Sequence, residues 1–283
     1  MPAALRAVPA AVDAVLRPLL AAPPRTARVV VTTRAAGYVD LGSVHGSAGR
    51  LVALLTPTAT RVPAGVLPAV DAVPLVAALR PGEEVVLGSG ALVVAGVRLQ
   101  PARWWDSQVP PVQLPTGAGA LPDPQLPALP DAVGPAADAL AQALEGPASS
   151  GFTSGGLRPA VGRLVGLGPG LTPAGDDVLA GALVALSAAG DRSRRTALAA
   201  AVGPLLGRTS AVSASLLCHA ADGRAVPELS RFVAGLARGG DVGVVVEDLL
   251  RVGASSGVAL ASGAVLGLRA ARAPDRPTSV EVA

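Results

Sequence analysis

Two adjacent aspartates, Asp176 and Asp177, follow a glycine-rich stretch and are the residues best placed to do chemistry. The stretch and the pair read Gly166-Leu-Gly-Pro-Gly-Leu-Thr-Pro-Ala-Gly-Asp-Asp, followed by the apolar run 178–186. Thr172 suits the N-cap of a helix, and Pro173 suits its first position. Glycines before a helix start let the backbone approach a ligand and direct N–H groups at an anion. We therefore predict an anion-binding loop at residues 168–175.

The two carboxylates should differ in surroundings, because adjacent residues on a helix point about 100° apart. At least one of them should border the core or a cleft. Gly175 suggests a special role for the segment, since Ala in the same first turn would be more stable by roughly 0.5–1 kcal/mol. The plainer interpretation is a well-capped helix whose two Asp complement the helix dipole.

The charge of this pair limits what the loop can bind. Two carboxylates repel a bare phosphate, so a phosphate here needs a cation, for which Mg²⁺ is the candidate, or one of the nearby arginines Arg158 and Arg163. Alternatively, the carboxylates accept hydrogen bonds from an amide NH2 while the N–H groups hold a carboxylate or phosphate. A carbamoyl compound has both features. No cofactor follows from the residues themselves.

Two further segments are rich in small hydroxyl residues. Thr209 and Ser213 lie one turn apart on a predicted helix and share a face, which indicates either a cap with a tight helix contact or a hydroxyl-lined wall of a site. Gly253-Ala-Ser-Ser-Gly257 is a second glycine-flanked helix start. His219 lies one turn from Ser215 but has no acidic residue nearby in sequence, which disfavours a Ser/His nucleophile. His45 is interpreted as a turn residue.

The glycine-rich stretch with its Asp pair, the Thr209/Ser213 pair and the 253–257 segment, at these separations, resemble the AllH-type family. This family, formerly filed as a domain of unknown function, includes a subunit of oxamate carbamoyltransferase. The similarity covers roughly residues 160–268. It implies the conversion of oxalurate and phosphate to oxamate and carbamoyl phosphate in purine and allantoin catabolism. It also implies a hetero-oligomer with an acyl-CoA-synthetase-like subunit and a second partner subunit.

The residues and the resemblance together give a set of candidate site residues. The candidate catalytic residues are Asp176 and Asp177. The candidate substrate-binding residues are Gly168, Gly170, Leu171, Thr172, Gly175, Thr209, Ser213, Ser255, Ser256 and Gly257. Two other functions stay open: a non-catalytic scaffold that completes the active site of a partner, and a subunit of a nucleotide-dependent kinase or ligase.

Composition narrows the classes of protein further. The chain has no Lys, which excludes a lysine Schiff base and the lysine of a P-loop. The pI of about 10.3 reflects the scarcity of titratable groups, since the net charge is only +3. Five aromatic residues and dispersed arginines disfavour nucleic acid. The single Cys218 cannot form an internal disulfide, and with two His it cannot make a Cys/His zinc site.

The hydropathy pattern favours a cytoplasmic protein. The longest uncharged candidate for a membrane span, Val252–Leu268, is short and rich in Gly, Ala and Ser. Arg6, Asp13 and Arg17 interrupt the N-terminal segment where a signal peptide needs an unbroken apolar core.

The elements that must position the candidate site fall into two regions. Short Val/Leu runs predict strands at 28–33, 38–44, 51–55, 84–87 and 91–99, with an amphipathic helix at 3–21 packed on them. Helical periodicity predicts helices at 131–144, 173–189, 194–206, 209–222, 227–238, 242–252 and 256–269. Trp104-Trp105 is interpreted as a packing anchor at the end of the strands.

The predicted fold class is α+β. Its domains are a β-rich N-terminal domain at 1–106, a Pro-rich connection at 107–133, a helical domain at 134–272 and a frayed tail at 273–283.

Overall fold

The structure, a computed structural model, describes residues 5–42, 51–69, 73–115, 121–145, 154–239 and 241–272. The chain divides into two compact units, Met1–Gln108 and Val109–Ala283. His45, residues 116–120 of the connection and the predicted tail at 273–283 lie outside the described residues. No helix in the described ranges is long and apolar enough to cross a membrane.

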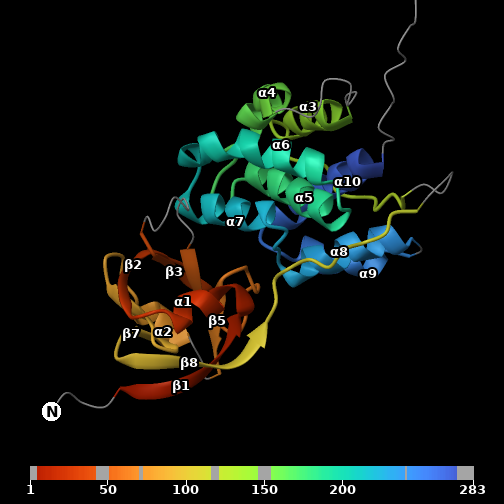
Figure 1. The fold of residues 1–283 in the computed structure, drawn as a ribbon. Coiled ribbons are helices and arrows are strands. Elements are labelled where there is room, and N and C mark those ends of the chain that lie inside the picture. Colours follow the sequence, from red (N-terminus) through yellow and green to blue (C-terminus); the bar gives the residue numbers. More distant parts are fainter. Residues whose placement is uncertain are drawn as a thin grey trace, which may run out of the picture. The chain divides into compact units, whose positions relative to one another are not determined.

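The N-terminal unit is a closed barrel of eight strands (Figure 1). Around the barrel the strands are β1 (Arg6–Asp13), β5 (Gly65–Pro68), β4 (Leu51–Leu55), β3 (Ala36–Asp40), β2 (Arg25–Thr32), β6 (Glu84–Gly88), β7 (Ala91–Val94) and β8 (Val97–Trp105). Parallel pairing of β1 with β8 closes the ring. The interior is filled by Val and Leu side chains, among them Val39, Val52 and Leu87.

The predicted α+β fold class is wrong, because the strands close into a barrel and the larger helices form a second unit. The error begins at the segment 3–21, predicted as one helix. Residues Arg6–Asp13 are strand β1, and only η1 (Ala14–Leu16) and α1 (Arg17–Ala21) are helical. Val8, Ala10 and Val12 are buried in alternation, and pairing with β5 and β8 decides between this two-residue period and the helical one.

Other differences in the barrel have local causes. The predicted strand 91–99 is a hairpin, since Ala95 and Gly96 both have positive φ and turn the chain between β7 and β8. Strand β5 was not predicted. It follows Ala64, whose N–H donates to the buried carboxylate of Asp13 at 2.8 Å. A short helix, α2 (Val73–Ala78), completes the unit.

The C-terminal unit is helical. Its elements are α3 (Gly134–Glu145), α4 (Ser154–Leu164), α5 (Ala174–Ala188), α6 (Arg192–Val202), η3 (Gly203–Arg208), α7 (Ala211–Ala221), α8 (Pro227–Arg238), α9 (Gly243–Leu250) and α10 (Ser256–Arg272). Helix α8 has the predicted bounds. Helix α4 was missed, because Gly155-Gly156 and the internal Pro159 interrupt its helical pattern.

Helix α5 lies at the centre of this unit, surrounded by other helices (Figure 1). All of its residues except Ser187 are buried. Its main neighbour is α10, and glycines make their close contact possible: a Cβ at Gly181 would collide with Leu260 O, and one at Gly263 with Val178 O. Two glycine positions thus bring the start of α10 to the start of α5.

The proline-rich segment runs along this helical unit where the structure describes it. Val109 N–H donates to Gly223 O at 2.9 Å, and Val112 N–H donates to Ala188 O at 2.8 Å. Arg272 Nε donates to Pro115 O at 3.2 Å. Residues 109–115 are therefore held by hydrogen bonds to the helices.

Candidate functional site

The glycine-rich stretch connects the end of α4 to the start of α5. The helix begins at Ala174 with Pro173 as its N-cap, and no side chain caps it. The predictions of Thr172 as the N-cap and Pro173 as the first helical residue are therefore wrong by one position. The hydroxyl of Thr172 instead lies 3.1 Å from the Ser256 hydroxyl at the start of α10.

Glycines of the stretch are required by packing as well as by backbone conformation. Gly175 lies so close to Leu164 O that a Cβ there would overlap it, and its N–H donates to Leu167 O at 2.9 Å. Gly166 has φ +76°, and a Cβ there would lie 2.6 Å from Arg208 O. Gly175 therefore has a structural explanation that requires no ligand, and its place in the first turn no longer indicates a binding site.

Asp176 is a buried connector, 1% exposed. One oxygen, Oδ1, accepts the Gly166 N–H at 2.8 Å. The other, Oδ2, accepts the hydroxyls of Thr209 and Ser213, the latter at 2.7 Å. The carboxylate thus ties the glycine-rich stretch and the start of α7 to α5, and both of its oxygens are occupied by these protein donors.

Asp177 is equally buried at 6% exposed but is differently satisfied. Its Oδ2 is shielded from solvent and has no hydrogen-bond partner. Burial raises the pKa of the Asp177 carboxyl to about 7, a hydrogen bond from the Ser256 side chain opposes the rise, and the charge of Asp176 adds to it. A carboxyl group with such a pKa can exchange a proton near neutral pH.

The start of α10 brings a hydroxyl group to the glycine-rich stretch. Ser256 is half-buried, its hydroxyl lies 3.1 Å from that of Thr172, and it acts to lower the pKa of Asp177. Gly257 is buried beneath Leu249 O, where a Cβ would not fit. Ser255 is exposed, and its side chain makes no hydrogen bond to the described residues. The structure therefore brings Ser256 into the cluster and leaves Ser255 at its edge.

Ser210 is a residue that sequence analysis missed. Its Oγ accepts the Ser213 N–H at 3.0 Å as the N-cap of α7 and donates to Leu171 O. Helix α7 begins at Ala211, two residues later than predicted. The signal was a Ser directly before the helical run, a residue type preferred at an N-cap, but this preference does not show which loop its hydroxyl holds.

The available backbone donors lie in the loop rather than in the helix. The N–H groups of Asp176 and Asp177 are bonded to Pro173 O, and that of Gly175 to Leu167 O. Among the described residues, no partner is found for the N–H groups of Gly168, Gly170, Leu171 and Thr172. Gly168 and Gly170 have positive φ and are exposed. Successive free N–H groups in such a loop can bind an anion.

The donor set offers little to a metal ion. Within the described residues, no group of three or more His, Cys, Asp or Glu side chains is found. Both oxygens of Asp176 accept protein hydrogen bonds. A Mg²⁺ ion carried by a phosphate would thus find one carboxylate with an unpaired oxygen, Asp177.

Other candidate residues lie apart from the cluster. His219 is buried on α7, where it interacts with another group of the protein. Arg158 and Arg163 are exposed on α4. In the barrel, the guanidinium of Arg17 stacks 4.2 Å from the centre of the Trp104 ring, in keeping with a packing role for this tryptophan.

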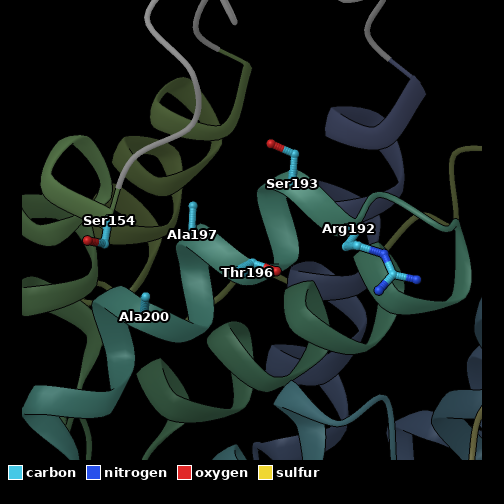
Figure 2. Close-up of a pocket in the computed structure, with 6 residues that line it drawn as sticks. All are labelled: Ser154, Arg192, Ser193, Thr196, Ala197 and Ala200. Atoms are coloured by element: carbon cyan, nitrogen blue, oxygen red, sulfur yellow. The ribbon is translucent and has the colours of Figure 1, made fainter.

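A separate pocket of about 570 Å³ opens between α4 and α6 (Figure 2). Ser154 of α4 lines one side, and five residues of α6 line the other: Arg192, Ser193, Thr196, Ala197 and Ala200. None of them belongs to the Asp cluster. The described residues that line it carry no carboxylate, imidazole or thiol, so the hydroxyls of Ser154, Ser193 and Thr196 have no general base among them.

Fold and site together define a protein with a β-barrel unit and a helical unit. Two adjacent aspartates are buried in the helical unit, and one of them, Asp176, is hydrogen-bonded to a glycine-rich stretch. Residues 164–268 match the family described as oxamate carbamoyltransferase subunit AllH. The resemblance suggested by the sequence motifs is thereby confirmed over residues 164–268. The match contains every candidate site residue and lies wholly in the helical unit. Neither a curated protein nor a solved structure matches the chain.

Proposed function

We propose that this chain is a subunit of a carbamoyltransferase that interconverts oxalurate plus phosphate with oxamate plus carbamoyl phosphate in purine and allantoin catabolism. The family match supports a carbamoyltransferase subunit. The observation that carries the site assignment is the contact between two segments 84 positions apart: the hydroxyl of Thr172, in the loop that leads into α5, lies 3.1 Å from the hydroxyl of Ser256 at the start of α10.

The cluster suits a substrate that is an anion and an amide at once. The free N–H groups of Gly168, Gly170, Leu171 and Thr172 can hold a carboxylate or a phosphate. The partly exposed hydroxyls of Thr172 and Ser256 lie at the same place and can bond a carbamoyl group. Asp176 serves the fold, since both of its oxygens are occupied. Asp177 is the carboxyl group left for chemistry.

The proposed site lies in a hetero-oligomer with an acyl-CoA-synthetase-like subunit and a second subunit. The chain has no Lys and one Cys, so positioning and electrostatics are what it contributes. A scaffold role without chemistry has one observation in its favour: Asp177 Oδ2 is shielded from solvent. The two functions differ in whether the reaction needs this carboxyl group.

The test is carbamoyl transfer by the assembled complex. The partner subunits, co-purified with and without this chain, are supplied with oxamate and carbamoyl phosphate, and oxalurate and phosphate are measured. We expect turnover only when the chain is present. Equal turnover without it would refute the proposal, as would the absence of oxalurate with the whole complex. A rate for the purified chain alone that matches the complex would refute the need for partners.

A further inference from the structure

We propose that Ser210 is a positioning residue for the anionic substrate: its hydroxyl holds the Leu171 carbonyl and thereby presents the Thr172 N–H to the anion. This inference rests on the proposed carbamoyl transfer and assigns a residue that sets the affinity of its site for phosphate. Neither the family match nor the sequence motifs assign such a role to Ser210.

The first step of the argument concerns the two hydrogen bonds of the Ser210 hydroxyl. An N-cap needs only an oxygen that accepts a backbone N–H, and Ser210 Oγ accepts that of Ser213 at 3.0 Å. The hydroxyl proton is not needed for the cap. Ser210 donates it to Leu171 O, 39 positions earlier in the chain. Ser210 therefore both caps α7 and fixes one peptide group of the glycine-rich stretch.

The second step is the geometry of that peptide group. The bond between Leu171 and Thr172 is trans, so its C=O and its N–H point in opposite directions. Because the carbonyl points to Ser210, the Thr172 N–H points away from it, and this N–H has no partner among the described residues. The Thr172 hydroxyl is also held, 3.1 Å from that of Ser256. Two helix starts thus hold one peptide group whose N–H is free.

The loop does not fix this orientation by itself. Gly168 and Gly170 have positive φ, and a glycine backbone has several accessible conformations. Without the bond from Ser210, the Leu171 carbonyl can turn to the side of the anion, where its partial negative charge repels a phosphate or carboxylate. The Ser210 hydrogen bond therefore decides whether the loop offers a donor or an acceptor at this point.

The surroundings of the loop favour an anionic ligand. The starts of α5, α7 and α10 meet there, and the N-terminus of each helix carries partial positive charge. The acidic residues at the start of α5 are Asp176 and Asp177, and both oxygens of Asp176 accept protein hydrogen bonds. Asp177, which is 6% exposed, has an oxygen without a partner. Such unsatisfied buried groups are few, and a bound water, an ion or a role in catalysis explains them. Asp177 is thus an independent sign of a ligand at this helix start.

The experiment compares Ser210→Gly, Ser210→Thr and the control Ser193→Gly in the assembled complex. Gly is nearly as good an N-cap as Ser but has no hydroxyl, whereas Thr keeps the hydroxyl. We expect Ser210→Gly to raise the KM for phosphate in oxalurate cleavage on the order of 10-fold or more. Its kcat should change much less, because the contact is made equally in the ground and transition states. Ser210→Thr should stay close to wild type. Ser193→Gly, the same change at an exposed position in the first turn of α6, should leave the KM unchanged.

Two further measurements separate positioning from a structural role. Isothermal titration of the complex with inorganic phosphate should show the same loss of affinity for Ser210→Gly, and urea unfolding of the full chain should give a midpoint close to wild type. Unchanged phosphate affinity in Ser210→Gly, equal losses in Ser210→Thr, or a markedly lower unfolding midpoint with the raised KM would each overturn the proposal, as would a wild-type complex that binds no phosphate. A wild-type complex that binds phosphate through Ser210 but forms no oxalurate would instead refute the carbamoyl transfer, so the two failures are distinguishable.

Discussion

Asp176 and Asp177 are neighbours in sequence with opposite energetic roles. Asp176 accepts hydrogen bonds on both oxygens from Gly166, Thr209 and Ser213. Asp177 keeps an unpaired buried oxygen. The sequence predicted that the two would differ, because a helix separates them by about 100°. It could not show which was which, because the partners of Asp176 lie 10 to 37 residues away.

The first prediction concerns Asp177→Asn and the pH dependence of unfolding. The folded-state pKa is raised from 3.8 to about 7, so the folded chain binds the proton more tightly than the unfolded chain. The contribution of protonated Asp177 to the free energy of unfolding is thus fully present below about pH 4, and it is lost as the pH rises through about 7. The loss is on the order of 3–4 kcal/mol.

The Asn variant avoids the cost of ionising this buried group. At pH 8 we expect the variant to unfold at a higher denaturant concentration than wild type, with a free energy of unfolding that is higher by roughly 1–3 kcal/mol. This figure allows for the cost of the unpaired amide group that Asn introduces. At pH 4 the variant should lose this advantage. Urea unfolding at the two pH values measures the difference. A variant less stable than wild type at pH 8 would show that the ionised Asp177 is well satisfied in the fold.

Asp176→Asn should have the opposite effect on stability. An amide cannot accept on both sides, so at least one of the donors that meet at this carboxylate loses its partner. We expect a loss of roughly 2–4 kcal/mol at pH 8. Asp138→Asn, at an exposed position on α3, is the matched control and should change the free energy of unfolding little. An Asp176→Asn variant as stable as this control would contradict the connector role.

At the scale of elements, the contact of α5 with α10 depends on glycine. A Cβ at Gly263 would collide with Val178 O, whereas one at Gly162 in α4 would meet only Arg208 Nη1 at 3.9 Å. We expect Gly263→Ala to lower the free energy of unfolding by roughly 1–3 kcal/mol or more. Gly162→Ala should be neutral or stabilising by up to about 1 kcal/mol, because Ala favours a helix over Gly. Thermal or denaturant unfolding that reverses this order would contradict the packing.

Elements with a strong local signal were predictable. Strand β4 and helix α8 have the predicted bounds, since one is a continuous apolar run and the other has Pro at its first position and Gly after its end. Strand β1 was mistaken for a helix, because its pattern fits both periods and pairing with β5 and β8 decides. Helix α4 was missed for its Gly and Pro residues, although packing stabilises it.

At the scale of the whole molecule, barrel closure and the convergence of the site were beyond local sequence patterns. The α+β class failed because strands β1 and β5 were both missed, and without them the sheet is open instead of closed. The motifs around Gly166, Thr209 and Ser256 were each recognised, but their mutual contacts join residues up to 84 positions apart. The family match covers the part of the chain in which these contacts lie, while the barrel lies outside it.

The central claim is that the assembled carbamoyltransferase needs the carboxyl group of Asp177. The most direct measurement is kcat for oxalurate formation from oxamate and carbamoyl phosphate at pH 7, with Asp177→Asn and the control Asp138→Asn each assembled with the partner subunits. We predict a fall in kcat on the order of 100-fold or more for Asp177→Asn, with assembly intact and the control close to wild type. Wild-type turnover by an assembled Asp177→Asn complex would contradict the account.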